Sequence, residues 1–203
     1  MPVAPEKTLE FERLLATLSS RFINLPTDQV ESEINRALKR VVEFLDVDRS
    51  SFFELDEDKK TIVTIQSYAV GGIEPFKSND VSTVLPWYTE KIIQGDIIIY
   101  SRLPDELPPE AATEKDYCRQ TSMRSNLTIP IKVAGGGICA IAFGSFHEYR
   151  KWSDDLIPRL KLVGEIISNA MVRKRSDEKR QQSLDEIKQL QEQFEKDCIY
   201  LQE

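Results

Sequence analysis

The 203-residue chain has few of the residue types that most often carry chemistry. It has one histidine, His147, and three cysteines, Cys118, Cys139 and Cys198, which are widely spaced and form no Cys-x-x-Cys pair. This set argues against a zinc site and against a framework of disulfide bonds. The acidic residues are dispersed, so we expect no other metal site. These absences indicate a protein of a reducing compartment.

Long apolar runs and an excess of basic charge are also lacking. No stretch approaches the roughly 18 continuous apolar residues of a membrane helix. The first residues have neither the basic start nor the apolar run of a secretion signal. The net charge of −7 argues against binding nucleic acid through bulk electrostatics. We therefore expect a cytoplasmic protein that contacts neither membrane nor nucleic acid.

The first half of the chain changes from a helical to a strand-like apolar period. Apolar residues recur at helical spacing over residues 8–24 and again from about 28 to 45, which predicts two helices. The period then becomes two, which predicts strands over 49–55 and 61–70 with a charged hairpin loop between them.

The second half is punctuated by proline and glycine. Pro86 and Gly95 delimit a short helix, because proline is favoured at the first helical position and glycine just after the last. The remaining predicted elements are a strand over 96–100, a proline-broken helical stretch over 107–122, and a hairpin of strands over 125–133 and 138–146. Strands paired by hairpins, with helices before and after, predict an α+β fold whose central antiparallel sheet has five or six strands.

The final segment, from Ser153 to Glu203, predicts a single helix on the order of 70 Å long. Its heptad seam is apolar before residue 171, polar from 173 to 181, and apolar again from 184. This pattern indicates a dimer interface, a polar middle and a coiled coil that leads outward. The alternative is one core helix followed by a frayed tail.

The polar middle contains a basic run, Arg173–Arg175, continued by Lys179 and Arg180. Asp177 and Glu178 interrupt the run. We therefore interpret it as a solvated helix face rather than as a contact with nucleic acid.

Several segments, in this order, resemble one known family. They are an amphipathic helix over 34–45, Val-Asp-Arg-Ser-Ser-Phe-Phe-Glu-Leu over 47–55, Met-Arg-Ser-Asn-Leu-Thr-Ile-Pro-Ile-Lys-Val over 123–133, Ile-Cys-Ala-Ile-Ala-Phe-Gly over 138–144, and Tyr-Arg-Lys-Trp over 149–152. The combination resembles GAF domains over roughly residues 8 to 172. The resemblance implies a sensory module, with helices from both termini on one face of the sheet and a ligand pocket on the other.

The last ten residues, Phe-Glu-Lys-Asp-Cys-Ile-Tyr-Leu-Gln-Glu over 194–203, resemble a particular linker. It precedes the ATPase module of bacterial enhancer-binding transcription activators of the formate-regulator type. The nearest alternative setting is a GAF sensor histidine kinase of a two-component system. The chain has no Gly-x-x-x-x-Gly-Lys-Ser/Thr phosphate loop. We expect an N-terminal helix over 1–26, a GAF domain over 27–172 and a signalling helix over 173–203 that leads to an effector joined after it.

The GAF resemblance also implies which residues line the pocket. It places the pocket beneath segments 72–95 and 100–124, with seven candidate residues: Tyr68, Trp87, Tyr88, Tyr100, Cys118, Arg124 and Ser125. The aromatic residues offer walls with polar edges, and Arg124 could pair with the carboxylate of a small organic acid. The alternative is that the aromatic residues pack in the core and that Arg124 anchors a loop.

We expect no cofactor. The Asn-Lys-Phe-Asp-Glu signature of GAF domains that bind cyclic nucleotides is absent. A bilin-binding cysteine is commonly followed by histidine, whereas Cys118 is followed by Arg119. Haem needs an axial ligand in the pocket, and we expect His147 at the rim.

We also expect no catalysis. A known enzyme with a GAF fold, the free methionine sulfoxide reductase, needs two cysteines that converge in the pocket, and only Cys118 is expected there. Arg119 could lower the pKa of this thiol and make it redox-reactive; the alternative is a half-buried thiol without a role. The expected function is therefore a sensory module that binds a small ligand and signals through a parallel homodimer, formed by its first and last helices, to a transcription-activator output domain. The alternatives are a ligand-free dimerisation module and the reductase.

Overall fold

The computed structural model describes residues 5–56, 61–133 and 136–200, with side chains from residue 7 to residue 194. Five strands form one antiparallel sheet in the order β2-β1-β5-β4-β3: β1 (Arg49–Asp56), β2 (Thr61–Ala69), β3 (Ile98–Tyr100), β4 (Ser125–Lys132) and β5 (Ile138–Ser145). The predicted α+β class and antiparallel sheet are confirmed, with five strands. The predicted strand over 96–100 is shorter, because only Ile98–Tyr100 pairs with β4.

Alternation along the strands divides the core between the two faces of the sheet. On β1, Phe52 packs against the terminal helices, whereas its neighbour Phe53 packs on the opposite face. The register with β2 shifts between these two residues, which marks a bulge. Each strand therefore supplies side chains both to a helix-side core and to a second, smaller core.

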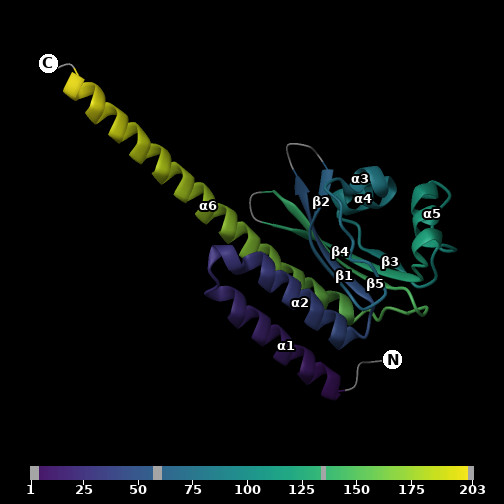
Figure 1. Ribbon diagram of the computed structural model, residues 1–203. Helices are drawn as coiled ribbons and strands as arrows, with labels where there is room; N and C mark the ends of the chain where they lie inside the picture. Colours follow the sequence, from purple (N-terminus) through teal and green to yellow (C-terminus); the bar gives the residue numbers. More distant parts are fainter. Residues whose placement is uncertain (1–4, 57–60, 134–135, 201–203) are drawn as a thin grey trace.

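The N- and C-terminal helices cover one face, as predicted (Figure 1). α2 (Val30–Leu45) packs on β1 and β2, α6 (Leu156–Tyr200) packs on β4 and β5, and α1 (Pro5–Ile23) lies outside both. A 3-10 turn, η1 (Thr27–Gln29), joins α1 to α2.

The opposite face carries α3 (Val81–Val84), α4 (Pro86–Gln94) and α5 (Ala112–Thr121) (Figure 1). Pro86 opens α4, and Gly95 ends it with a φ of +83°, in the left-handed region that glycine adopts without strain. The stretch predicted as weakly helical over 107–122 is an ordered helix from Ala112 onward. These helices form the roof of the site described below.

α6 continues far beyond the domain as one straight element (Figure 1). The prediction for the first part of its seam is wrong: Val163 and Ala170, expected to face a partner chain, are buried in this chain's own core. Leu184, Ile187 and Phe194, farther along the same seam, are exposed. No helix within the described part of the chain is long and apolar enough to cross a membrane.

The basic run on α6 anchors the helix to the domain, contrary to its interpretation as a solvated face. Arg173 donates hydrogen bonds to the carbonyl oxygens of Phe22 and Ile23, the end of α1. Lys174 and Arg175 pair with Glu31 of α2 and Glu54 of β1. The exposed pair between Arg180 and Asp177, at 3.2 Å, is the part of the run that does lie in solvent.

Candidate functional site

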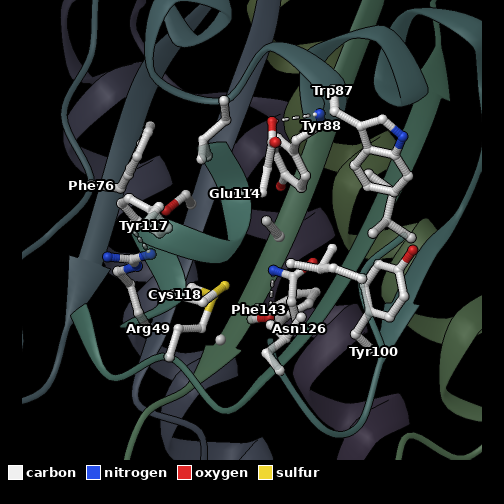
Figure 2. A pocket seen from close by; sticks show the side chains of 18 of the residues that line it. Arg49, Phe76, Trp87, Tyr88, Tyr100, Glu114, Tyr117, Cys118, Asn126 and Phe143 are labelled. Carbon is white, nitrogen blue, oxygen red and sulfur yellow. Dashed lines mark hydrogen bonds between the residues drawn. The ribbon is translucent and has the colours of Figure 1, made fainter. Parts of the chain in front are cut away.

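A cavity of about 60 Å³ lies between the sheet and the helices α4 and α5 (Figure 2). Its walls are largely apolar and aromatic. Its lining includes Arg49, Phe53, Trp87, Tyr88, Tyr100, Glu114, Tyr117, Cys118 and Asn126. The cavity lies on the sheet face away from the terminal helices, which is where the resemblance to GAF domains places it.

Four of the seven residues predicted for the pocket line this cavity: Trp87, Tyr88, Tyr100 and Cys118. Figure 2 shows Trp87 and Tyr100 on one side of the cavity, with Cys118 of α5 toward the other side. The two aromatic rings lie 6.3 Å apart, measured between centroids. They form one wall.

The other three predicted residues, Tyr68, Arg124 and Ser125, are not among the residues that line it. Tyr68 pairs across the strands with Ser50, and cross-strand partners share a face. Ser50 donates to Leu38 of α2, so this face is the helix side. Tyr68 therefore packs against the helix-side core.

Arg124 and Ser125 hold the loops at the edge of the sheet. The guanidinium of Arg124 lies 5.5 Å from the centroid of the Tyr149 ring, a cation–π contact rather than a contact with the cavity. Ser125 precedes Asn126, which faces the cavity, so strand alternation turns Ser125 away. Its Oγ donates to the carbonyl of Ser101 at 2.8 Å and accepts from the amide of Arg150 at 2.7 Å.

The cation of the site is Arg49, at the start of β1, which is not among the seven residues predicted for the pocket. Its side chain donates to the hydroxyl of Tyr117 at 2.8 Å and to the carbonyl of Glu74 at 3.3 Å. Its guanidinium also lies 4.6 Å from the centroid of the Phe146 ring. Counting in steps of two along β1 from Phe53 reaches Arg49, so the strand period carried a signal for it.

Glu114 is the acidic residue of the site and was also missed. It lies on α5 and is 5% exposed. Its Oε1 accepts a hydrogen bond from the backbone N–H of Tyr88 at 3.1 Å, which ties α5 to the first turn of α4 (Figure 2). Its Oε2 is buried and has no hydrogen-bond partner. No sequence period marks one glutamate in a short helix above a pocket.

A chain of hydrogen bonds fixes the floor of the cavity. Tyr88 Oη and Thr128 Oγ1 share a hydrogen bond of 2.7 Å, and Thr128 Oγ1 donates to Asn126 Oδ1 at 3.0 Å. The Nδ2 of Asn126 donates to the carbonyl of Phe143 at 3.3 Å. Burial raises the pKa of Tyr88 far above its ordinary value, so its phenol is neutral and donates to Thr128.

Cys118 is not an activated thiol. Burial, followed by the charge of Glu114, raises its pKa to about 12. Arg119 lowers that pKa, as expected, but its effect is the smallest of the four causes, because Arg119 lies on the exposed side of α5 and pairs with Asp116 at 2.7 Å. The hypothesis of a thiol activated by Arg119 is therefore wrong.

The other described cysteine side chain belongs to the opposite face of the sheet. Cys139 is buried in the helix-side core, where burial raises its pKa to about 11. It therefore does not converge with Cys118. The side chain of Cys198 lies outside the described residues.

The lining contains groups that can bind a small molecule. Among the residues that the structure describes, there is no group of three or more His, Cys, Asp and Glu side chains able to hold a metal ion. The cavity offers aromatic and aliphatic walls, a guanidinium, a carboxyl with one unpartnered oxygen and a fixed amide. A mostly apolar concave site with a few placed polar groups is the usual form of a small-molecule site.

Fold and cavity together define a small α+β ligand-pocket domain from which one long helix projects. The chain belongs to the GAF domain family, whose pattern matches residues 29–171. No curated protein sequence matches the chain.

Solved structures of GAF domains share this fold. The phycocyanobilin-bound GAF domain of a cyanobacterial phytochrome superposes with a TM-score of 0.64 at 13% identity, over 86% of this chain and 98% of that one. The free methionine-R-sulfoxide reductase of Neisseria meningitidis, solved with its substrate, gives a TM-score of 0.62 at 12% identity, over 87% and 96% of the two chains. A cyanobacteriochrome GAF domain gives 0.58 at 14% identity, over 78% and 94%. At these identities the likeness shows the fold alone.

Proposed function

We propose that this chain is a non-enzymatic, cytoplasmic sensory module. It binds a small ligand in the cavity roofed by α4 and α5. It transmits the occupancy of that cavity through α6, as a parallel coiled-coil homodimer, to a transcription-activator output domain joined beyond α6. A histidine-kinase output is the alternative setting.

The observation that carries the proposal is that β1 touches both the cavity and the output helix. The side chain of Phe53 lines the cavity, and its neighbour Glu54 forms an ion pair with Arg175 of α6. Adjacent residues on a strand face opposite ways, so a shift of β1 beneath a ligand also shifts the anchor of α6. The ladder between β1 and β2 is irregular at this point, where Ile65 of β2 is the extra residue of a bulge.

The exposed part of α6 supports the dimer. Leu184 and Phe194 are 54% and 71% exposed, and Ile187 lies between them on the same heptad seam. An exposed seam of large apolar side chains on a projecting helix is what a parallel partner helix would cover. Val163 and Ala170 are engaged within the chain, so the interface of the proposed dimer begins beyond the anchors at 173–175.

The neighbours differ in what they do, and two of their activities fit this chain poorly. A linear tetrapyrrole, such as the one in the phytochrome GAF domain, is far larger than a cavity of about 60 Å³. The reductase chemistry discussed above needs a second thiol beside the first, and Cys139 faces the other side of the sheet. These points favour a sensor over the reductase, and a small ligand over a bilin.

Native mass spectrometry of the protein as purified tests the dimer and the retained ligand together. The wild type should be a dimer, and Leu184→Glu with Ile187→Glu should be a monomer with the same thermal unfolding of the domain. Gln182→Glu with Gln189→Glu adds the same charge on the outer side of the helix and should remain a dimer. A wild type that is monomeric throughout would overturn the coiled-coil output. A dimer whose cavity never takes up a small molecule would favour the ligand-free dimerisation module.

A further inference from the structure

The cavity wall contains a carboxyl group that is only half satisfied. Glu114 is 5% exposed, and its Oε1 accepts from the backbone of Tyr88, whereas its Oε2 has no partner. Buried polar atoms in native proteins nearly always have a partner, because an unpaired one costs about 1–3 kcal/mol. Only one other buried side-chain atom among the described residues shares this condition, Thr89 Oγ1 on α4. Thr89 is not in the lining, so Glu114 is the unpaired group that a ligand in the cavity would meet.

No basic side chain among the described residues forms an ion pair with the Glu114 carboxyl group. The charged side chain that also lines the cavity is Arg49, which is engaged by Tyr117, Glu74 and the ring of Phe146. Both residues act on Cys118, because Glu114 raises the pKa of this thiol and Arg49 lowers it. Glu114 thus stands at one side of the cavity without a cation, and Arg49 stands at another side with its own partners.

The walls beside Glu114 suit a cation. Trp87 and Tyr100 form the aromatic wall, and Tyr88 follows Trp87 at the start of α4 (Figure 2). Aromatic faces attract ammonium groups, and the attraction grows when the site excludes water. A protonated amine offers three N–H donors and a positive charge, so it can satisfy a carboxylate oxygen more strongly than a neutral donor can.

The size of the cavity limits the ligand. Its volume of about 60 Å³ is well below the roughly 150 Å³ of an engineered cavity that admits benzene. This volume matches a molecule with only a few non-hydrogen atoms.

We propose that the cavity binds a small protonated amine, whose nitrogen donates to the carboxylate of Glu114 and whose apolar part lies against Trp87 and Tyr100. This inference rests on the proposed function, because it names the chemical class that the sensory pocket takes. It replaces the expectation of an organic acid held by Arg124, which does not line the cavity.

The test compares three probes with three carbon atoms each and different head groups: n-propylamine, 1-propanol and propionate. Each is titrated into the full chain at neutral pH, and binding is followed by the NMR signals of the Asn126 side-chain amide and the Gly144 backbone amide, both in the lining. n-Propylamine should bind about ten-fold tighter than either other probe, because it alone brings a positive charge as well as a hydrogen-bond donor to the carboxylate of Glu114.

Two variants assign the effect to its residue. Glu114→Gln keeps the size and the acceptor for Tyr88 but removes the charge, and it should lower n-propylamine affinity about ten-fold while leaving 1-propanol binding unchanged. Unchanged propanol binding shows that the variant is folded. Glu110→Gln, an exposed glutamate two residues before α5, should change nothing.

The outcomes separate the inference from the function on which it rests. Propionate or propanol binding as tightly as the amine, or an amine affinity that Glu114→Gln leaves intact, would overturn the amine class but keep the pocket as a ligand site. If no probe shifts the NMR signals of Asn126 or Gly144, both the proposal of an amine ligand and the proposal of a sensory pocket would be overturned.

Discussion

Arg175 of α6 and Glu54 of β1 form an ion pair that joins the projecting helix to the central sheet. The Glu54 side chain is 6% exposed, whereas that of Arg175 is about half exposed, so the acid is buried and the base reaches it from the surface. Phe53, the neighbour of Glu54, lines the cavity on the other face. The pair therefore lies where a change in the cavity can reach α6.

Arg175→Ala should lower the free energy of unfolding by about 1–2 kcal/mol, because it leaves the buried Glu54 carboxylate without its cation. Chemical denaturation followed by circular dichroism measures the change. Arg180→Ala removes an exposed pair with Asp177 on the same helix and should cost less than about 0.5 kcal/mol. Equal effects of the two variants would show that the Glu54 pair does not anchor α6.

Arg49→Met should destabilise the domain by about 2–3 kcal/mol and loosen α5. The variant leaves the Tyr117 hydroxyl and the Glu74 carbonyl without their donor and removes the cation that lies over Phe146. Hydrogen exchange of the α5 amides should quicken more than exchange in β4.

The matched control for this variant is Arg119→Met, on the exposed side of α5, where the pair with Asp116 lies in solvent. It should change neither stability nor exchange appreciably. If Arg49→Met left exchange in α5 unchanged, Arg49 would not hold the roof of the cavity.

What the sequence predicted well are elements with local signals. Pro86 and Gly95 mark both ends of α4, and the period of two marks β1. The faces of individual residues were harder, because the face depends on pairing between strands far apart in the chain. Tyr68 faces the helices because it pairs with Ser50. The register of this hairpin shifts at a bulge, so the sequence of β2 alone does not show which of its residues face the helices.

The acidic residue that completes the site could not be found from periodicity, although the strand period does point to Arg49. Glu114 is one of several charged residues in a polar stretch, and only its hydrogen bond to Tyr88 shows that it points inward. The α6 seam was ambiguous for a related reason. The sequence pattern is the same for an apolar heptad position that packs on its own sheet, as Val163 does, and for one that packs on a partner helix, as we propose for the exposed Leu184.

The buried thiols should make the protein less stable in alkali. Burial raises the pKa of Cys118 from 9.0 to about 12 and that of Cys139 to about 11. Above pH 9 the unfolded chain loses thiol protons that the folded chain still holds, so the free energy of unfolding falls as pH rises, by at most about 1.4 kcal/mol per pH unit for each thiol.

Cys118→Ala removes one of these thiols and should therefore flatten the fall in stability between pH 9 and pH 11. Urea denaturation of the wild type and the variant under reducing conditions measures the two slopes. Parallel curves would mean that Cys118 titrates alike in both states and that its environment in the folded chain is not the dry one described here.

The last prediction concerns Gly164, where α6 crosses the sheet. A Cβ at this position would overlap Cδ1 of Ile131 and lie 3.2 Å from Cγ2 of Ile141, and both isoleucines are buried. Valine at a helical glycine recovers some backbone entropy, but its three carbons would have to enter a packed interface, which typically costs 1–3 kcal/mol or more. Gly164→Val should therefore lower the free energy of unfolding by about 2–3 kcal/mol. Gly71→Val, in a loop with no atom within 4 Å of its Cβ, should leave it nearly unchanged. If both variants were neutral in chemical denaturation, α6 would not approach β4 and β5 closely enough to need glycine. The close packing of α6 on the sheet, through which we propose that the cavity affects the output helix, would then be wrong.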